Sequence, residues 1–176
     1  MTAAFVRDAA ATAAVFGFFA ASWFGWAQDD PPGPWRRPLI AGSILSLLTA
    51  VAGGLLTWRH WTDGTALDAD TSRAFGVVVG IELVAAGLGA TLLARRRRSD
   101  LVPAWVAGVV GVHLVPLAWL LRYPLIGVVG VLVTLAAVVA VPLARSRSLA
   151  VSAVTGLAAG TVLLAAALFS TASVLL

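Results

Sequence analysis

The chain has 176 residues, of which 60% are hydrophobic and 11% are charged, and its formal net charge is +4. A soluble domain of this size needs far more polar surface, so the composition indicates an integral membrane protein and excludes a soluble enzyme. All twelve basic residues are arginines, most of them at the ends of apolar runs, which is typical of contact with lipid headgroups and indicates no nucleic-acid partner.

Six apolar runs predict an all-α fold, a polytopic membrane protein whose six transmembrane helices form one bundle. Each run reaches the roughly 20 residues that a helix needs to cross a bilayer. The first run is longer than the apolar core of a signal peptide and has no basic leader, so we expect it to be a transmembrane helix. The predicted helices of this single domain, residues 1–176, cover about 3–27, 38–57, 73–95, 101–121, 123–144 and 149–176.

The connection between the second and third runs, residues 58–73, is the longest polar segment of the chain. It holds four side chains that could bind a cation, His60, Asp63, Asp68 and Asp70. The spacing of the three acids does not fit an EF-hand loop. We therefore expect a solvated loop, no metal site and no cofactor, with a magnesium or calcium site as the alternative.

The arginines also predict the orientation of the helices. The first, third and fifth connections hold eight arginines, four of them at residues 95–98, and the opposite side holds four. Because arginine-rich connections stay in the cytoplasm, the count predicts a multi-pass protein of the cell membrane with both termini outside.

The third run carries the only glutamate, Glu82, near its middle. A charged side chain at that depth costs roughly 2.5–3.5 kcal/mol on insertion scales, so an acid there indicates function by default. Burial disfavours the charged form, and an unpaired Glu82 would keep its proton and could donate it. We interpret Glu82 as a general acid, a proton carrier or a cation-binding group. The alternative is a neutral carboxyl that joins two helices through a hydrogen bond.

His113 in the fourth run lies three residues before Pro116, which cannot donate to the carbonyl of Val112. Glu82 and His113 each lie nine positions from the arginine that flanks their run, so both reach a depth of roughly 13 Å at a rise of ~1.5 Å per residue. We predict that the two side chains border one cavity inside the bundle. The alternative for His113 is a hydrogen bond to the free carbonyl and no further role.

Asp8 in the first run lies nearer the outer boundary, on the same half of the bundle as Glu82 and His113. Two readings of Asp8 are open. It pairs with Arg73 or Arg122 of another helix, or it contributes with Arg122 to a substrate site. Five phenylalanines are interpreted as packing or lipid-facing residues: Phe16, Phe18, Phe19, Phe75 and Phe169.

Two Gly-x-x-x-Gly pairs occur, Gly76 with Gly80 and Gly156 with Gly160. Glycines at this spacing let helix backbones approach each other closely. We therefore predict close helix packing at both pairs, and no nucleotide site.

The segment GVHLVPLAWLLRYPLIGVVG, residues 111–130, resembles a group of small bacterial membrane proteins with a Gly-x-His-x-x-Pro-Leu-Ala motif. This group is similar to the small membrane cyclases of bacterial indole-sesquiterpenoid pathways, which cyclise a prenylated chain by protonation. The resemblance implies an inner-membrane isomerase, a terpene cyclase, with Glu82 and His113 catalytic. It also implies Trp119 and Trp105 as aromatic walls of the substrate site, and a substrate that arrives from the lipid.

Two other function classes stay open beside the cyclase. In a proton- or cation-coupled transporter or channel, Glu82 would bind the coupling ion. In an accessory membrane subunit, Glu82 would only join two helices. The partners expected in every case are membrane lipid and, for the first two classes, an apolar small molecule; a homodimer is a further alternative.

Overall fold

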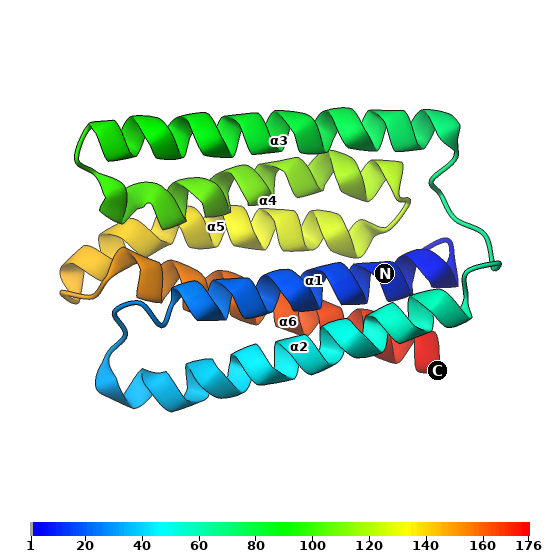
Figure 1. The fold of residues 1–176 in the computed structure, drawn as a ribbon, viewed down its shortest axis with the longest axis horizontal. Helices are drawn as coiled ribbons and strands as arrows, with labels where there is room; N and C mark the ends of the chain where they lie inside the picture. Colours follow the sequence, from blue (N-terminus) through cyan, green and yellow to red (C-terminus); the bar gives the residue numbers. More distant parts are fainter. Residues whose placement is uncertain (1) are drawn as a thin grey trace.

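The computed structural model describes residues 2–176, and it is built from helices (Figure 1). Among the described residues there are six long helices and no strand, and each long helix is long and apolar enough to cross a membrane. The predicted all-α fold of six helices is therefore confirmed. The long helices are α1 (Val6–Trp26), α2 (Arg36–Arg59), α3 (Ala69–Arg95), α4 (Val102–Leu120), α5 (Pro124–Ser146) and α6 (Val151–Leu175), with short 3-10 helices at Gly33–Trp35 and Ser99–Leu101.

The helices are arranged as a bundle in which α1 packs against α2 and α6, and α4 packs against α5. The α5–α6 contact joins these two groups. Helix α3 lies at one edge beside α4, and α1 begins at the same end of the bundle at which α6 ends (Figure 1). The first, third and fifth connections therefore lie together at the other end.

Small residues set the close approach of α1 to its two neighbours. A methyl group on Gly53 of α2 would collide with the backbone of Ala14, and one on Gly156 of α6 would lie 2.5 Å from the carbonyl oxygen of Trp23. Close packing at Gly156 and Gly160 is thus confirmed. The same prediction for Gly76 and Gly80 is wrong within this chain, because a methyl group on either would meet no atom within 4 Å.

The pair α4 and α5 is held equally closely near the middle of the bundle. A methyl group on Gly111 would collide with Thr134, and one on Gly130 would lie 2.6 Å from the carbonyl oxygen of Gly111. His113 is two residues after Gly111, so this contact fixes the height and rotation of the helix that carries it.

Helix α3 is the least enclosed of the six, because none of its residues is buried. Its half-buried residues recur every three or four positions, among them Ala74, Val78, Glu82 and Ala85. This spacing is that of one helix face turned to the bundle, and Glu82 stands in its middle.

Helix α3 begins at Ala69, four residues before the predicted start. The reason is Asp68, whose carboxylate accepts a hydrogen bond from the backbone N–H of Thr71 at 2.7 Å and caps the helix. The same hydrogen bond lowers the pKa of the Asp68 carboxyl below its ordinary value.

Candidate functional site

Glu82 of α3 and His113 of α4 face each other across the seam between their helices. The Oε2 atom of Glu82 lies 3.3 Å from Nε2 of His113. The side chains are only 16% and 14% exposed, respectively. Two groups that can each carry a proton are therefore in contact, largely shielded from the surroundings.

The second ring nitrogen of His113 has no hydrogen-bond partner among residues 2–176, although the atom is buried. It does not bond the carbonyl of Val112, which was the alternative role for this histidine. Buried polar atoms are normally satisfied, so this nitrogen, Nδ1, is an exception and can still bind a proton or a ligand while Nε2 faces Glu82.

The first of two cavities at this pair lies between α3, α4 and α5 and has a volume of about 600 Å³. We call it the α3–α5 cavity. Glu82 and His113 line this cavity, and Thr134 is the only lining residue with a hydroxyl group. That hydroxyl donates to the carbonyl of Gly130 at 2.8 Å, so the rest of this cavity suits hydrocarbon.

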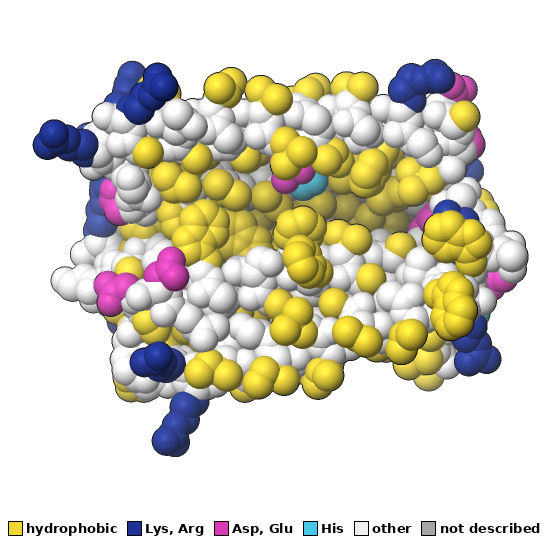
Figure 2. Space-filling model, in the orientation of Figure 1, with side chains coloured by type: hydrophobic (Ala, Val, Ile, Leu, Met, Phe, Trp, Pro, Cys, Tyr) yellow, Lys and Arg dark blue, Asp and Glu magenta, His cyan; other side chains and the backbone are white. Residues whose placement is uncertain are grey.

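The second cavity, the α1–α3 cavity, has a volume of about 450 Å³ and lies where α1 approaches α3 and α4. Glu82 and His113 line this cavity too. Figure 2 shows a hollow between α3 and α1 that is lined by hydrophobic side chains, with an acidic side chain and a histidine side by side at its centre. Both volumes fall in the range of roughly 300–1,000 Å³ typical of small-molecule sites.

Three phenylalanines line the α1–α3 cavity, Phe16 and Phe19 of α1 and Phe75 of α3. Phe16 is buried in the core, Phe75 packs against it and Phe19 is half exposed, which agrees with their interpretation as packing or lipid-facing residues. Their position beside a cavity was not predicted. The signal was present for Phe75, which precedes Glu82 by seven residues and so lies on the same helix face two turns away.

Trp105, expected as an aromatic wall, lines the α3–α5 cavity. Its indole N–H donates to the carbonyl oxygen of Ala85 at 3.1 Å, one helical turn from Glu82. A methyl group on Gly89 would collide with the indole, so this glycine makes room for the contact. Trp105 thus holds α3 against α4 near the Glu82–His113 pair.

Asp8 does not form the predicted ion pair with Arg73 or Arg122, and that prediction is wrong. The connection after α2 folds back over the start of α1 instead. The two carboxylate oxygens of Asp8 accept hydrogen bonds from the hydroxyl of Thr65 and the backbone N–H of Ala66, both at 2.7 Å. Asp8 is 5% exposed and lines the α1–α3 cavity.

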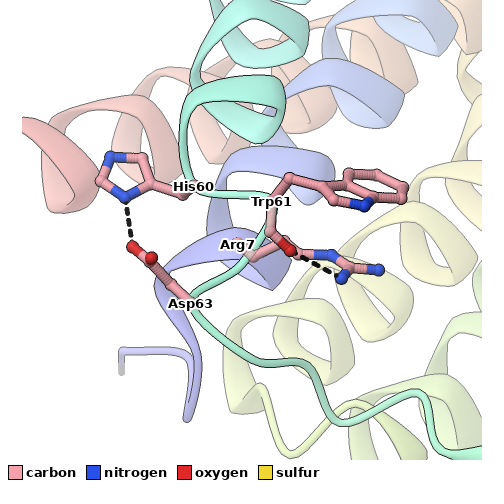
Figure 3. A network of polar contacts seen from close by, with 4 residues as sticks. All are labelled: Arg7, His60, Trp61 and Asp63. Atoms are coloured by element: carbon pink, nitrogen blue, oxygen red, sulfur yellow. Dashed lines mark hydrogen bonds and ion pairs between the residues drawn. The ribbon is translucent and has the colours of Figure 1, made fainter.

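The same connection is attached to α1 a second time. Arg7 donates to the carbonyl oxygen of Trp61 at 3.0 Å, and its guanidinium lies 4.1 Å from the centre of the Trp61 ring (Figure 3). Figure 3 also shows His60 paired with Asp63. The distance between Nδ1 of His60 and Oδ2 of Asp63 is 2.6 Å.

The acids of this connection have separate partners. Asp63 pairs with His60, Asp68 caps α3, and Asp70 lies 3.2 Å from Arg73. Within residues 2–176 there is no group of three side chains that could hold a metal ion.

Two predicted substrate-binding residues lie away from the pair. Trp119 is 87% exposed, and Arg122 is exposed in the turn between α4 and α5 with a positive φ of 50°. Neither residue lines either cavity. The structure brings together Glu82 and His113, places Asp8 in the same cavity, and leaves Trp119 and Arg122 outside.

This arrangement can transfer a proton to an apolar molecule. It offers a carboxyl, an imidazole with one unpartnered nitrogen, and two adjoining spaces lined by hydrocarbon and aromatic side chains. Compared with protein-family models, with curated proteins and with solved structures, the chain matches none.

Proposed function

We propose that the protein is an integral membrane isomerase that cyclises an unsaturated, isoprenoid-like hydrocarbon by protonation, as a terpene cyclase does. The observation that carries this proposal is the contact between Glu82 and His113 at the border of two apolar cavities. A proton donor beside hydrocarbon-lined space has an apolar molecule as its natural acceptor.

The reaction needs no cofactor and leaves the composition of the substrate unchanged. The Glu82 carboxyl gives its proton to one carbon of a terminal C=C bond, and the other carbon becomes a cation. A second C=C bond supplies its electron pair to that cation and closes a ring. The new cation then loses a proton from a neighbouring carbon to the Glu82 carboxylate, which restores the acid.

The surrounding side chains support each step. The faces of Phe16, Phe19 and Phe75 attract a cation, with roughly 0.5–2 kcal/mol for each well-placed ring. His113 orients the carboxyl and, through its unpartnered nitrogen, can hold a proton between turnovers. The apolar walls exclude water, which would otherwise trap the cation.

In this proposal the six long helices cross the cell membrane with both termini outside. Helix α3 contacts mainly α4, and a hollow separates it from α1 (Figure 2). An apolar substrate then reaches the pair sideways from the lipid, without passing through water.

The experiment uses purified protein in lipid nanodiscs in D₂O, with prenylated compounds that end in an alkene. The Glu82 proton exchanges with D₂O when no substrate is bound, so the predicted product has the substrate's formula with one hydrogen replaced by a carbon-bound deuterium, detected by mass spectrometry. Glu82→Gln should abolish the product, and Glu82→Asp should retain part of the rate because it keeps an acid. Ring formation without deuterium, or full activity in Glu82→Gln, contradicts the proposal.

A second function is favoured by one observation, because Glu82 and His113 line both cavities. A proton-coupled transporter would use the pair as the group that binds the proton in either of two states. In liposomes with an imposed pH gradient, a transporter would accumulate an apolar amine, unaltered, beyond the level that the amine reaches by passive diffusion in protein-free liposomes. The cyclase would give a new product and no accumulation.

A further inference from the structure

The α1–α3 cavity has the shape of a long slot. Its lining residues run from Asp8 to Phe19 on α1 and from Val110 to Leu121 on α4. Eleven steps at a rise of ~1.5 Å make a length of roughly 16 Å along both helices. A volume of about 450 Å³ spread over that length suits an extended molecule better than a round one.

The polar side chains of this slot are gathered at two places. Asp8 is the first lining residue of α1, and Thr12 follows it by one turn. Leu121, at the end of α4, lies at the same end of the bundle as the start of α1 (Figure 1). His113 is eight residues from Leu121 and three from Val110, so Glu82 and His113 lie toward the other end of the slot. Between the two places the walls are apolar, with Phe16, Leu114 and Leu117 among them.

Asp8 keeps capacity to bind a further hydrogen-bond donor. Each carboxylate oxygen has about two acceptor positions. Each accepts one hydrogen bond, from Thr65 or from Ala66. Among the described residues no arginine or histidine nitrogen lies within 4.0 Å of Asp8, although its neighbour Arg7 is next in the chain. Buried carboxylates are usually paired with a cation, and this one borders the slot.

We propose that the slot binds an elongated amphipathic molecule whose hydrogen-bond-donating head group sits at Asp8 and whose hydrocarbon chain runs to Glu82 and His113. This inference rests on the proposed function, for which it names the substrate class. The head group sets the position of the chain, so that its far C=C bond lies against the acid. A hydrocarbon without a hydrogen-bond donor would have no fixed position along the slot.

The probes are farnesol and its methyl ether, which share the chain and differ in the O–H donor. Equilibrium binding to the protein in nanodiscs is measured for each, with protein-free nanodiscs subtracted. A hydrogen bond to a charged acceptor predicts that farnesol binds about tenfold more tightly than the ether. In Asp8→Asn the preference should fall below about threefold.

The control variant is Thr65→Val, which removes one hydrogen bond to Asp8 and keeps its carboxylate. The inference predicts a tenfold preference in Thr65→Val, as in the unchanged protein. If Thr65→Val and Asp8→Asn lose the preference equally, Asp8 acts only by attaching the connection to α1, and the inference is overturned. Equal affinities for the two probes in the unchanged protein, or no binding of either, overturn it without any variant.

Failure here is separable from failure of the cyclase proposal. Glu82→Gln should keep the farnesol preference, because the donor binds at the other end of the slot. A head-group preference that depends on Asp8, together with no deuterated product, would retain this inference and reject the cyclase. Deuterated product without a preference for farnesol over its ether would support the cyclase and reject this inference.

Discussion

Glu82 has a partner and a neighbouring void at the same time. A carboxyl that only joins two helices would be enclosed by packed side chains, as buried amides are. Here the Glu82 carboxyl meets His113 at 3.3 Å, and both side chains border cavities of about 600 and 450 Å³. The acid is therefore placed to meet a molecule that enters either space.

His113 gives the first prediction, which concerns the reaction rate. His113→Gln should lower the cyclisation rate by roughly 10²–10⁴-fold, the usual contribution of a group that transfers protons. The control is Thr134→Val in the α3–α5 cavity, whose hydroxyl is already bonded within α5. Equal rates for both variants would show that His113 has no part in proton transfer.

The sequence predicted that Glu82 and His113 lie close together, but it did not predict the partners of Asp8. The matching depths of Glu82 and His113 followed from counting along helices of fixed rise. The partners of Asp8 did not, because they depend on how a 9-residue connection between α2 and α3 folds back, and helix periodicity says nothing about that path. Trp119 shows a further limit, since depth alone does not determine which way a side chain faces.

At the scale of helices, the bundle consists of a close-packed part and one loosely attached helix. Glycines of α2 and α6 pack closely against α1, and the predicted pair Gly156 and Gly160 belongs to this contact. Helix α3 has no buried residue, so its Gly76 and Gly80 meet no neighbour. A glycine pattern identifies a helix that can pack closely, and only the fold decides whether a partner is present.

Neighbouring glycines on α2 test this division. Gly53→Ala should destabilise the protein by about 1–3 kcal/mol, because its methyl group collides with the backbone of α1. Gly54→Ala places a methyl group in open space and should stabilise the helix by up to about 1 kcal/mol. Denaturant titration in micelles measures both. Equal effects of the two substitutions would contradict the close α1–α2 contact.

The start of α3 should respond to acid. The pKa of Asp68 is lowered in the folded protein, so its charged form stabilises the helix start above its ordinary pKa. That contribution is lost as the pH falls through the lowered value. Amide exchange of Thr71 and Ser72 should therefore accelerate at acid pH, after correction for the intrinsic rate. In Asp68→Asn the asparagine still caps the helix but does not titrate, so the acceleration should disappear. If this variant shows the same pH response as the unchanged protein, the prediction is contradicted.

At the scale of the whole molecule, the charges divide between the two ends of the bundle. The first, third and fifth connections lie at one end, and together with the helix ends beside them they carry eight arginines. In the proposed orientation, with the arginine-rich end in the cytoplasm, the Asp8 end of the slot would lie near the outer surface. The six-helix fold was predictable from hydrophobicity alone, whereas the hollow beside α3 was not, since every helix is apolar enough to pack on any other.

Orientation can be measured in intact cells, because the chain has no cysteine. Single cysteines at Thr65 and at Ser99 replace residues in connections at opposite ends. A membrane-impermeant maleimide should label Thr65→Cys in whole cells and Ser99→Cys only after the membrane is opened. The reverse pattern would place both termini inside.

The central claim is that Glu82 is an acid within reach of a molecule dissolved in lipid. Labelling with a hydrophobic carbodiimide, which attacks protonated carboxyls from the apolar phase, tests it without a known substrate. We predict one adduct, mapped by mass spectrometry to Glu82, that a water-soluble carbodiimide does not form and that a bound prenyl alcohol suppresses. A folded protein whose Glu82 stays unmodified by the hydrophobic reagent would contradict the account.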